Sequence, residues 1–231
     1  CFDVSELEWT GLLQVGELLE ALQQHLAPAY FETCVVTYSD AVESIPPETL
    51  EGLDKVIVQM FRPHFPEMIE TPRAPQEWFD YEMRRVVETV PTEKLVVAIG
   101  SGGLMWIAGE SGPRQVDHAE IMRRLHHYGG YELFPERARN PMVTLINETG
   151  QNERIWYLDA ATAYNQLRLA QDLGVSRIAI WDVGREDPSV WQLLREPALE
   201  PDSAAVALET VRLDDSVRYT GSGPFHDFES Q

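Results

Sequence analysis

Residues 75–100 read PQEWFDYEMRRVVETVPTEKLVVAIG, and this stretch decides the fold that we expect. In its first part, 75–90, apolar side chains recur every three or four residues, which is the spacing of an amphipathic helix. Its last part, 94–100, is a continuously apolar run that ends at a glycine, as expected of a strand buried on both faces. A helix that leads into such a strand is typical of a parallel sheet covered by helices.

The same alternation of strand and helix extends on both sides of this stretch. Further short apolar runs predict strands at 1–4, 33–38, 55–61 and 177–181. Helical spacing predicts helices at 11–26, 46–53, 117–128 and 159–174, and a last helix that begins near Pro188. Together these patterns predict an α/β fold with five parallel strands.

One segment departs from this alternation. Residues 142–158 contain two strand-like runs on either side of a turn with Gly150, which predicts an antiparallel β-hairpin before the last strand. The triplet 147–149 in this turn, Asn-Glu-Thr, matches a glycosylation signal, but we expect it to serve the turn. Between 101 and 116 we expect an irregular connection.

Composition and charge exclude some classes of partner. The chain has 231 residues, of which 44% are hydrophobic and 24% charged, as in ordinary soluble globular proteins. Its formal net charge of −20 argues against nucleic acid as a partner, because binding phosphates requires clustered lysine and arginine. No apolar stretch approaches the roughly 18 residues that a membrane-spanning helix needs.

The two cysteines, Cys1 and Cys34, are too few for a disulfide framework or a four-ligand zinc site. They lie on neighbouring predicted strands, which leaves a disulfide between them as an option, but we expect buried free thiols.

The first residue is Cys1 rather than methionine, and it leads directly into a strand. We therefore expect the chain to be a piece of a longer polypeptide, with one domain at 1–195. Residues 196–231 are rich in proline, alanine and acids, and we expect a linker and the start of a following domain there.

The order of elements, the hairpin with its following helix, and the ending WDVGREDPSVW (181–191) resemble the C-terminal part of a family 18 glycoside hydrolase. The likeness is greatest to the bacterial branch found in spore-cortex enzymes and in proteins that fuse such a barrel to polysaccharide deacetylase and glycosyltransferase domains. It covers roughly 1–195 and is strongest at 154–191. The resemblance implies a partial TIM (β/α)8 barrel that holds strands four to eight, with the hairpin inserted before the last strand.

The resemblance also implies what the protein handles. The partner is an N-acetylglucosamine-containing polysaccharide, and deacetylase or glycosyltransferase domains are covalently linked in the full-length protein. No cofactor and no metal is implied. The residues alone leave the location open, and the resemblance implies an extracytoplasmic or membrane-associated one.

Family 18 enzymes carry D-x-x-D-x-D-x-E on strand four, where the glutamate protonates the glycosidic oxygen and the substrate's own N-acetyl group attacks the anomeric carbon. By resemblance, Asp3 matches the aspartate that orients the N-acetyl group, and Ser5 falls on the glutamate position. A serine hydroxyl holds its proton too tightly to act as a general acid near neutral pH. The neighbouring Glu6 points outward if the strand alternates strictly, whereas a bulge near Val4 would turn it inward and restore an acid.

Two further family motifs are altered. The motif M-x-Y-D on strand six corresponds to QMFR (59–62), so that Phe61 lacks the tyrosine hydroxyl and Arg62 replaces the aspartate. On strand seven, Trp106 matches the tryptophan of Y-G-Y-D-W, but its polar neighbours are missing. These departures suggest a barrel that keeps sugar-binding aromatic residues and has lost the acid.

The resemblance assigns further ligand contacts. Trp181, at the end of the last predicted strand, matches the tryptophan that forms the floor beneath the N-acetylglucosamine ring. The alternative is a core tryptophan that closes the barrel. His64 follows strand six beside Arg62 and is a candidate contact at the barrel mouth.

Other signals carry no chemistry in our interpretation. IGSGG (99–103) lacks the spacing of a phosphate-binding or nucleophile motif, and we expect a glycine turn at a strand end. The adjacent His126 and His127 do not have the spacing of a metal pair on a helix, and we expect them on the surface. Asp182, Glu186 and Asp187 are expected to serve turns and helix caps.

These observations lead to three hypotheses of function. The first is a chitinase-like domain that binds the polysaccharide with lost or weak hydrolysis. The second is an active family 18 glycosidase that uses Glu6 or another acid on the barrel rim. The third is a structural module that spaces neighbouring catalytic domains.

Because five strands of an eight-stranded barrel leave two open edges, we also expect the isolated chain to be poorly soluble or dimeric.

Overall fold

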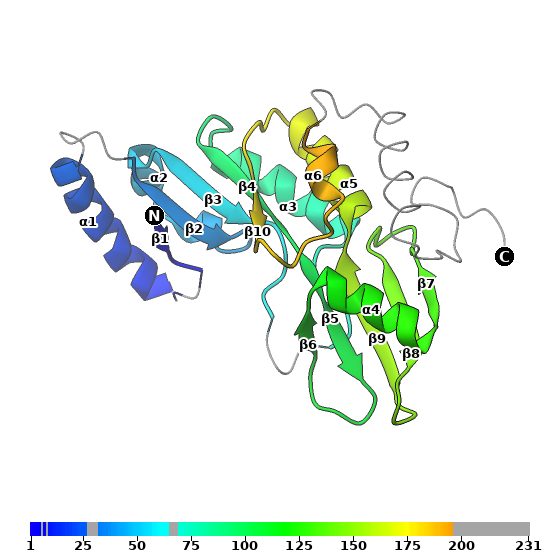
Figure 1. Ribbon diagram of the computed structural model, residues 1–231. Helices are drawn as coiled ribbons and strands as arrows, with labels where there is room; N and C mark the ends of the chain where they lie inside the picture. Colours follow the sequence, from blue (N-terminus) through cyan, green and yellow to red (C-terminus); the bar gives the residue numbers. More distant parts are fainter. Residues whose placement is uncertain (6, 8, 27–31, 65–68, 196–231) are drawn as a thin grey trace. The chain divides into compact units, whose positions relative to one another are not determined.

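The computed structural model describes residues 1–5, 7, 9–26, 32–64 and 69–195 (Figure 1). Within these ranges the chain forms a mixed α/β structure with two five-stranded sheets. It divides into two compact units. The first comprises 1–61, 79–99 and 169–179, and the second comprises 62–78, 100–168 and the described residues from 180 onward.

One sheet contains all five strands that the apolar runs predict. Its order is β1-β2-β3-β4-β10, and the register of β1 with β2, β2 with β3 and β3 with β4 is parallel. The strands are β1 (Phe2–Asp3), β2 (Cys34–Tyr38), β3 (Lys55–Gln59), β4 (Leu95–Gly100) and β10 (Ile178–Trp181). The prediction of these strands is confirmed, although β1 and β3 end earlier than expected.

The helices follow their predicted positions closely. They are α1 (Trp9–Leu26), α2 (Pro47–Gly52), α3 (Gln76–Thr89), α4 (His118–Tyr128), α5 (Ala160–Asp172) and α6 (Val190–Leu193), with a short 3-10 helix at Val42–Ser44. The buried side chains of α3 include Phe79, Met83 and Val86, which have the three- and four-residue spacing seen in the sequence. The Asp159 carboxylate accepts a hydrogen bond from the Thr162 backbone N–H at 2.7 Å and so caps the start of α5.

The second sheet is antiparallel and larger than the predicted hairpin. Its order is β6-β5-β9-β8-β7. The strands are β5 (Gly102–Ile107), β6 (Arg114–Val116), β7 (Tyr131–Leu133), β8 (Met142–Ile146) and β9 (Asn152–Leu158). The hairpin of β8 and β9 is confirmed, with Ile146 opposite Asn152. The Asn147 side chain accepts hydrogen bonds from the backbone N–H groups of Thr149 and Gln151, which confirms its expected role in the turn.

The irregular connection expected at 101–116 is therefore wrong, because β5 and β6 form there. Gly102 and Gly103, which suggested a turn, stand at the start of β5. A Cβ atom on Gly103 would lie 2.6 Å from the Trp156 carbonyl oxygen and 2.7 Å from the Tyr157 Cβ. The glycine is there because β9 approaches the backbone closely at this point.

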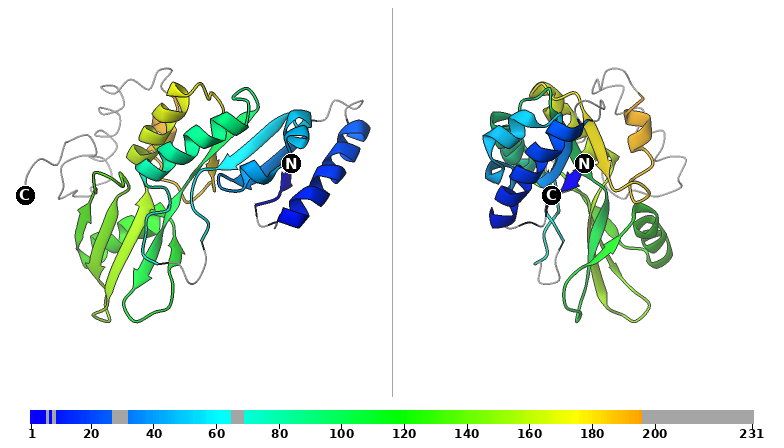
Figure 2. Two further views of the ribbon diagram at one scale, coloured as in Figure 1. Left: turned by 180° about the vertical axis from the view of Figure 1, so that it is seen from behind. Right: turned by 90° about the vertical axis from the view of Figure 1, so that its left-hand side faces the viewer.

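The two faces of the antiparallel sheet differ. One face packs against α4 in a core that includes Met105, Val143, Ile155 and Ile121. Figures 1 and 2 show α4 lying along this face. Residues that alternate with the core positions, such as Trp106, therefore lie on the opposite face.

The expectation of free thiols is also wrong. Cys1 and Cys34 form a disulfide with their Cα atoms 4.4 Å apart, and neither cysteine is free. The register of the parallel pair explains this, because Phe2 lies opposite Val35 and each preceding cysteine is thereby placed opposite the other.

Some predictions concern residues that the structure does not describe. Glu6, and the linker and the start of a following domain expected in 196–231, lie outside the described ranges. In the described part of the chain, no helix has both the length and the apolar character needed to cross a membrane.

Candidate functional site

The first part of the candidate site lies at the carboxyl ends of β1 and β3. The side-chain amide of Gln59, the last residue of β3, donates a hydrogen bond to the Ser5 hydroxyl oxygen at 2.9 Å. Only 3% of Gln59 is exposed, whereas Ser5 is partly exposed. The buried amide therefore fixes the hydroxyl that stands at the position expected of the acid.

Asp3 is joined to the same cluster through the backbone. One of its carboxylate oxygens accepts a hydrogen bond from the Ser5 backbone N–H at 3.0 Å. Because β1 ends at Asp3, Ser5 lies in a turn beyond the strand, and strict strand alternation does not fix the direction of its side chain. Asp3 itself is exposed and accessible to a ligand.

The chemistry of this cluster, made of Asp3, Ser5 and Gln59, is that of a hydrogen-bonding site. Neither a hydroxyl nor an amide releases a proton near neutral pH, so Ser5 and Gln59 cannot serve as a general acid. The partly exposed Ser5 hydroxyl can exchange hydrogen bonds with uncharged ligand groups such as hydroxyls and amides, whereas Gln59 is buried and serves to hold it.

The structure places Phe61 and Arg62 in supporting contacts. Phe61 is buried, and its ring packs edge-on against Tyr38 with centroids 6.1 Å apart. The Arg62 guanidinium donates to the Thr71 hydroxyl at 3.0 Å and lies 5.4 Å from the ring centroid of Trp78. Arg62 therefore holds the segment that follows β3, which limits its freedom to contact a ligand.

Trp181 is the last residue of β10 and is 37% exposed. The indole is thus partly open to solvent where β10 ends. The chain directly after it is anchored, because the Ser101 hydroxyl donates a hydrogen bond to the Asp182 carbonyl oxygen at 2.7 Å. An indole at a strand end next to a fixed turn can present a flat apolar surface to a ligand.

The turn after Trp181 is held by buried Asp187. Its carboxylate accepts hydrogen bonds from the backbone N–H groups of Ser189 at 2.9 Å and Ala160 at 3.0 Å. Burial works to raise the pKa of Asp187, but nearby His118 and these hydrogen bonds outweigh it and hold the pKa below its usual value. Asp187 thus has the turn and capping role that the sequence predicted.

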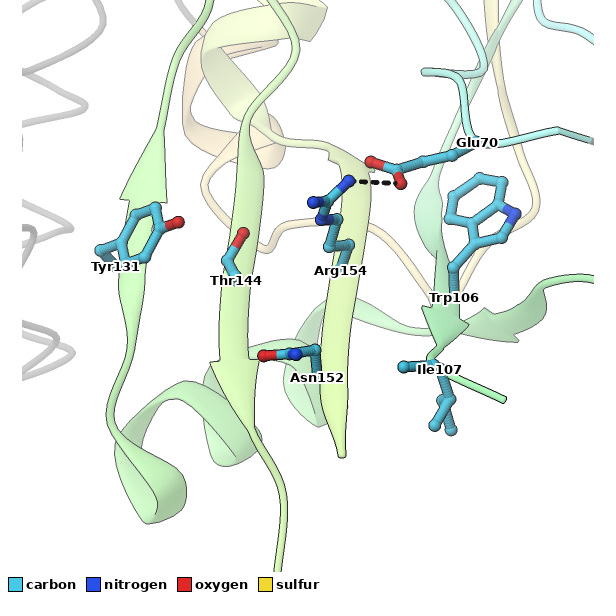
Figure 3. A pocket seen from close by; sticks show the side chains of 8 residues that line it. Glu70, Trp106, Ile107, Tyr131, Thr144, Asn152 and Arg154 are labelled. Atoms are coloured by element: carbon cyan, nitrogen blue, oxygen red, sulfur yellow. Dashed lines mark hydrogen bonds and ion pairs between the residues drawn. The ribbon is translucent and has the colours of Figure 1, made fainter. Parts of the chain in front are cut away.

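His64 and Trp106 lie in the second unit. His64 is half-buried, and its Nε2 lies 3.2 Å from the Pro113 carbonyl oxygen, within hydrogen-bonding distance. Trp106, in β5, lines a pocket of about 450 Å³ together with Glu70 and Arg154 (Figure 3). The sequence did not single out Glu70 or Arg154, and only the alternation of side chains along β9 points to Arg154.

The expected surface position of two histidines is confirmed, because His126 and His127 are exposed near the end of α4. Among the described residues, no group of three or more His, Cys, Asp or Glu side chains is placed to hold a metal ion.

Comparison with known proteins adds information on the fold. The sequence matches no protein-family model and no curated protein. Its fold is similar to that of a chitinase from Chromobacterium violaceum, with a TM-score of 0.73, 15% identity, and coverage of 84% of this chain and 63% of that chain. It is equally similar to the spore cortex-lytic enzyme SleL from Bacillus megaterium, with a TM-score of 0.73, 15% identity, and coverage of 84% and 47%.

A family 18 N-acetylglucosaminidase from Paenibacillus barengoltzii gives a TM-score of 0.58 at 16% identity, with coverage of 74% of this chain and 58% of that chain. The chain thus spans about half to two thirds of the length of these solved proteins. At such low identity the likeness concerns the fold alone. The chain therefore shares the mixed α/β, TIM-barrel-like fold of chitinase-like family 18 glycosidases.

Proposed function

We propose that this chain is a chitinase-like carbohydrate domain that binds an N-acetylglucosamine-containing polysaccharide with lost or weak hydrolysis. The hydrogen bond from the Gln59 amide to the Ser5 hydroxyl carries this proposal. The resemblance assigns the position of Ser5 to the catalytic acid, and the structure shows a hydroxyl there that is held by an amide. A buried amide bound to a hydroxyl supports recognition of a neutral sugar but supplies no proton for cleavage.

The proposal extends to the architecture. Residues 1–195 would form the C-terminal part of a (β/α)8 barrel, with β1, β2, β3, β4 and β10 as strands four to eight. This arrangement is supported by the order of the parallel sheet and by the likeness to longer solved chains. The domain would be covalently linked to deacetylase or glycosyltransferase domains in an extracytoplasmic or membrane-associated protein, with 196–231 as a linker and the start of a following domain.

Each unit would contribute its own contact to the polysaccharide. In the second unit, Trp181 would pack on the apolar face of an N-acetylglucosamine ring. In the first unit, Asp3 would accept a hydrogen bond from an N-acetyl group, as the resemblance implies. The exposure of both side chains at strand ends supports these roles.

The experiment is a calorimetric titration of the full-length protein with chitotetraose. Trp181→Ala should weaken binding roughly ten-fold, because it removes the aromatic surface. Trp191→Ala is the matched control, since Trp191 is 40% exposed in α6 and bonds Glu186 through its indole N–H at 2.9 Å. Equal loss of affinity in both variants, or none in either, would contradict the proposal. Glu6→Gln should leave the affinity unchanged.

A further inference from the structure

His118 is a buried titratable residue beside the turn that follows Trp181. It is the first residue of α4, and only 5% of it is exposed. Its Nε2 atom makes no hydrogen bond within the described residues and lies 3.8 Å from a carboxylate oxygen of Asp187. Building on the sugar-binding role proposed for Trp181, we propose that His118 is its positioning residue. When protonated, His118 stiffens the turn and so strengthens sugar binding at low pH.

The turn that follows Trp181 meets His118 at two points. The backbone N–H of His118 donates a hydrogen bond to the Arg185 carbonyl oxygen at 3.1 Å. The His118 imidazole faces the Asp187 carboxylate two residues further along the turn. Val183, between the indole and these contacts, is 69% exposed, so the tip of the turn has little packing of its own. The contacts with His118 therefore help to determine how firmly the indole is held.

The charge of the imidazole determines how strongly it attracts Asp187. At 3.8 Å the two groups make no hydrogen bond, so a neutral imidazole contributes little. A protonated imidazole forms an ion pair with the carboxylate, and burial leaves this pair less screened than one in solvent. Histidine side chains ordinarily change charge between about pH 5 and about pH 8, whereas carboxylates stay ionised there. The turn should therefore be held more firmly at the acidic end of this range.

The other titratable and charged groups on the elements around His118 have partners of their own. They are Tyr157, whose ring centroid is 6.0 Å from that of His118 and whose hydroxyl donates to Glu132; Arg185, which bonds Gln115 and lies 3.9 Å from Asp182; and Asp117 and Asp159, which cap α4 and α5. Among the described residues, the Asp187 carboxylate is thus the acidic group placed to pair with the imidazole.

The experiment follows the indole with and without sugar, in the full-length protein labelled with fluorotryptophan. The fluorine NMR signal of Trp181 is identified by its absence from the Trp181→Phe variant. Between about pH 8 and about pH 5.5 this signal should shift in the wild type and stay constant in His118→Gln. Calorimetry with chitotetraose should give a roughly three-fold higher affinity at the lower pH, and His118→Gln should abolish this difference.

Control variants separate this role from a general effect of pH. His126→Gln removes an exposed histidine from the same helix and should keep the wild-type response. Asp187→Asn removes the other charge and should flatten the response as His118→Gln does, with circular dichroism to confirm that both variants are folded.

The outcomes distinguish the positioning role from the proposed function. A Trp181 signal that does not shift in the wild type, a shift of equal size in His118→Gln, or a chitotetraose affinity that is the same at both pH values overturns the role of His118. If the shift depends on His118 while chitotetraose binds at neither pH, His118 does position the indole, and the sugar-binding function fails instead.

Discussion

The Gln59 side chain donates its amide hydrogen to the Ser5 hydroxyl at 2.9 Å, and this bond ties the carboxyl end of β3 to the turn after β1. Since Gln59 is buried, the bond gives its side-chain amide a hydrogen-bond partner in the absence of solvent. The bond therefore fixes a hydroxyl, and not a carboxylic acid, at the position that the resemblance predicts for the catalytic glutamate.

Removing the acceptor of this bond should destabilise the protein. Ser5→Ala should lower the free energy of unfolding by about 1 kcal/mol, because the buried Gln59 amide loses a hydrogen bond. Urea unfolding measures this difference. Ser176→Ala, at an exposed position before β10, should leave the free energy of unfolding unchanged. Equal stability of Ser5→Ala and the wild type would show that the bond contributes nothing.

Reduction of the disulfide should have a larger effect. The bond between Cys1 and Cys34 closes a loop with a sequence separation of 33 residues. Loop-closure entropy then contributes about 4 kcal/mol to stability, so dithiothreitol should lower the free energy of unfolding by that order. The double variant Cys1→Ser and Cys34→Ser should not respond to the reductant. A response of similar size in that variant would assign the effect to another cause.

The stability of the protein should depend on the ionisation of Asp187. Because its pKa in the folded state lies below the ordinary value of 3.8, its contribution is complete above that value. The contribution is lost as the pH falls through the folded-state pKa. Asp187→Asn should therefore lower the free energy of unfolding by about 2 kcal/mol at neutral pH and flatten its decline below about pH 4.

Thermal unfolding of Asp187→Asn across a pH series tests this prediction. Asp172→Asn is the control, because Asp172 is exposed at the end of α5 and should leave the pH profile as it is. An unchanged profile in Asp187→Asn would contradict the role given to its hydrogen bonds with Ser189 and Ala160.

A buried ion pair should stabilise the antiparallel sheet. Glu153, only 1% exposed, accepts two hydrogen bonds from Arg124 at 2.9 and 3.0 Å and one from the Asn147 amide at 2.9 Å. Glu153→Gln leaves Arg124 with only one of its two carboxylate partners, Glu120 at 2.6 Å, and should lower the free energy of unfolding by about 1–2 kcal/mol. Glu148→Gln in the exposed hairpin turn should have little effect, and similar losses in both variants would argue against the pair.

Much of the fold could be predicted from local sequence patterns. The five strands of the parallel sheet are apolar runs, and such runs are visible without knowledge of their partners. The strands β6 and β7 were missed because each has three residues, too few to establish a period. The disulfide was missed because it depends on the register of β1 against β2, which the sequence does not reveal.

The candidate site was predictable only in part. Asp3, Ser5 and Trp181 came from family resemblance, and the structure adds contacts that no local pattern contains. Glu70 and Arg154 are separated by 84 positions in the sequence, so their ion pair depends on the tertiary fold. Gln59 stood within a recognised motif, but its bond to Ser5 spans 54 positions and could not be seen there.

The most direct test of the central claim is the release of reducing ends from chitotetraose by the full-length protein. The account predicts that the sugar binds while product release stays at the level of a protein-free control, and that Glu6→Gln changes neither quantity. Steady product release that Glu6→Gln abolishes would contradict the account, because it would show that a working acid acts beside Ser5.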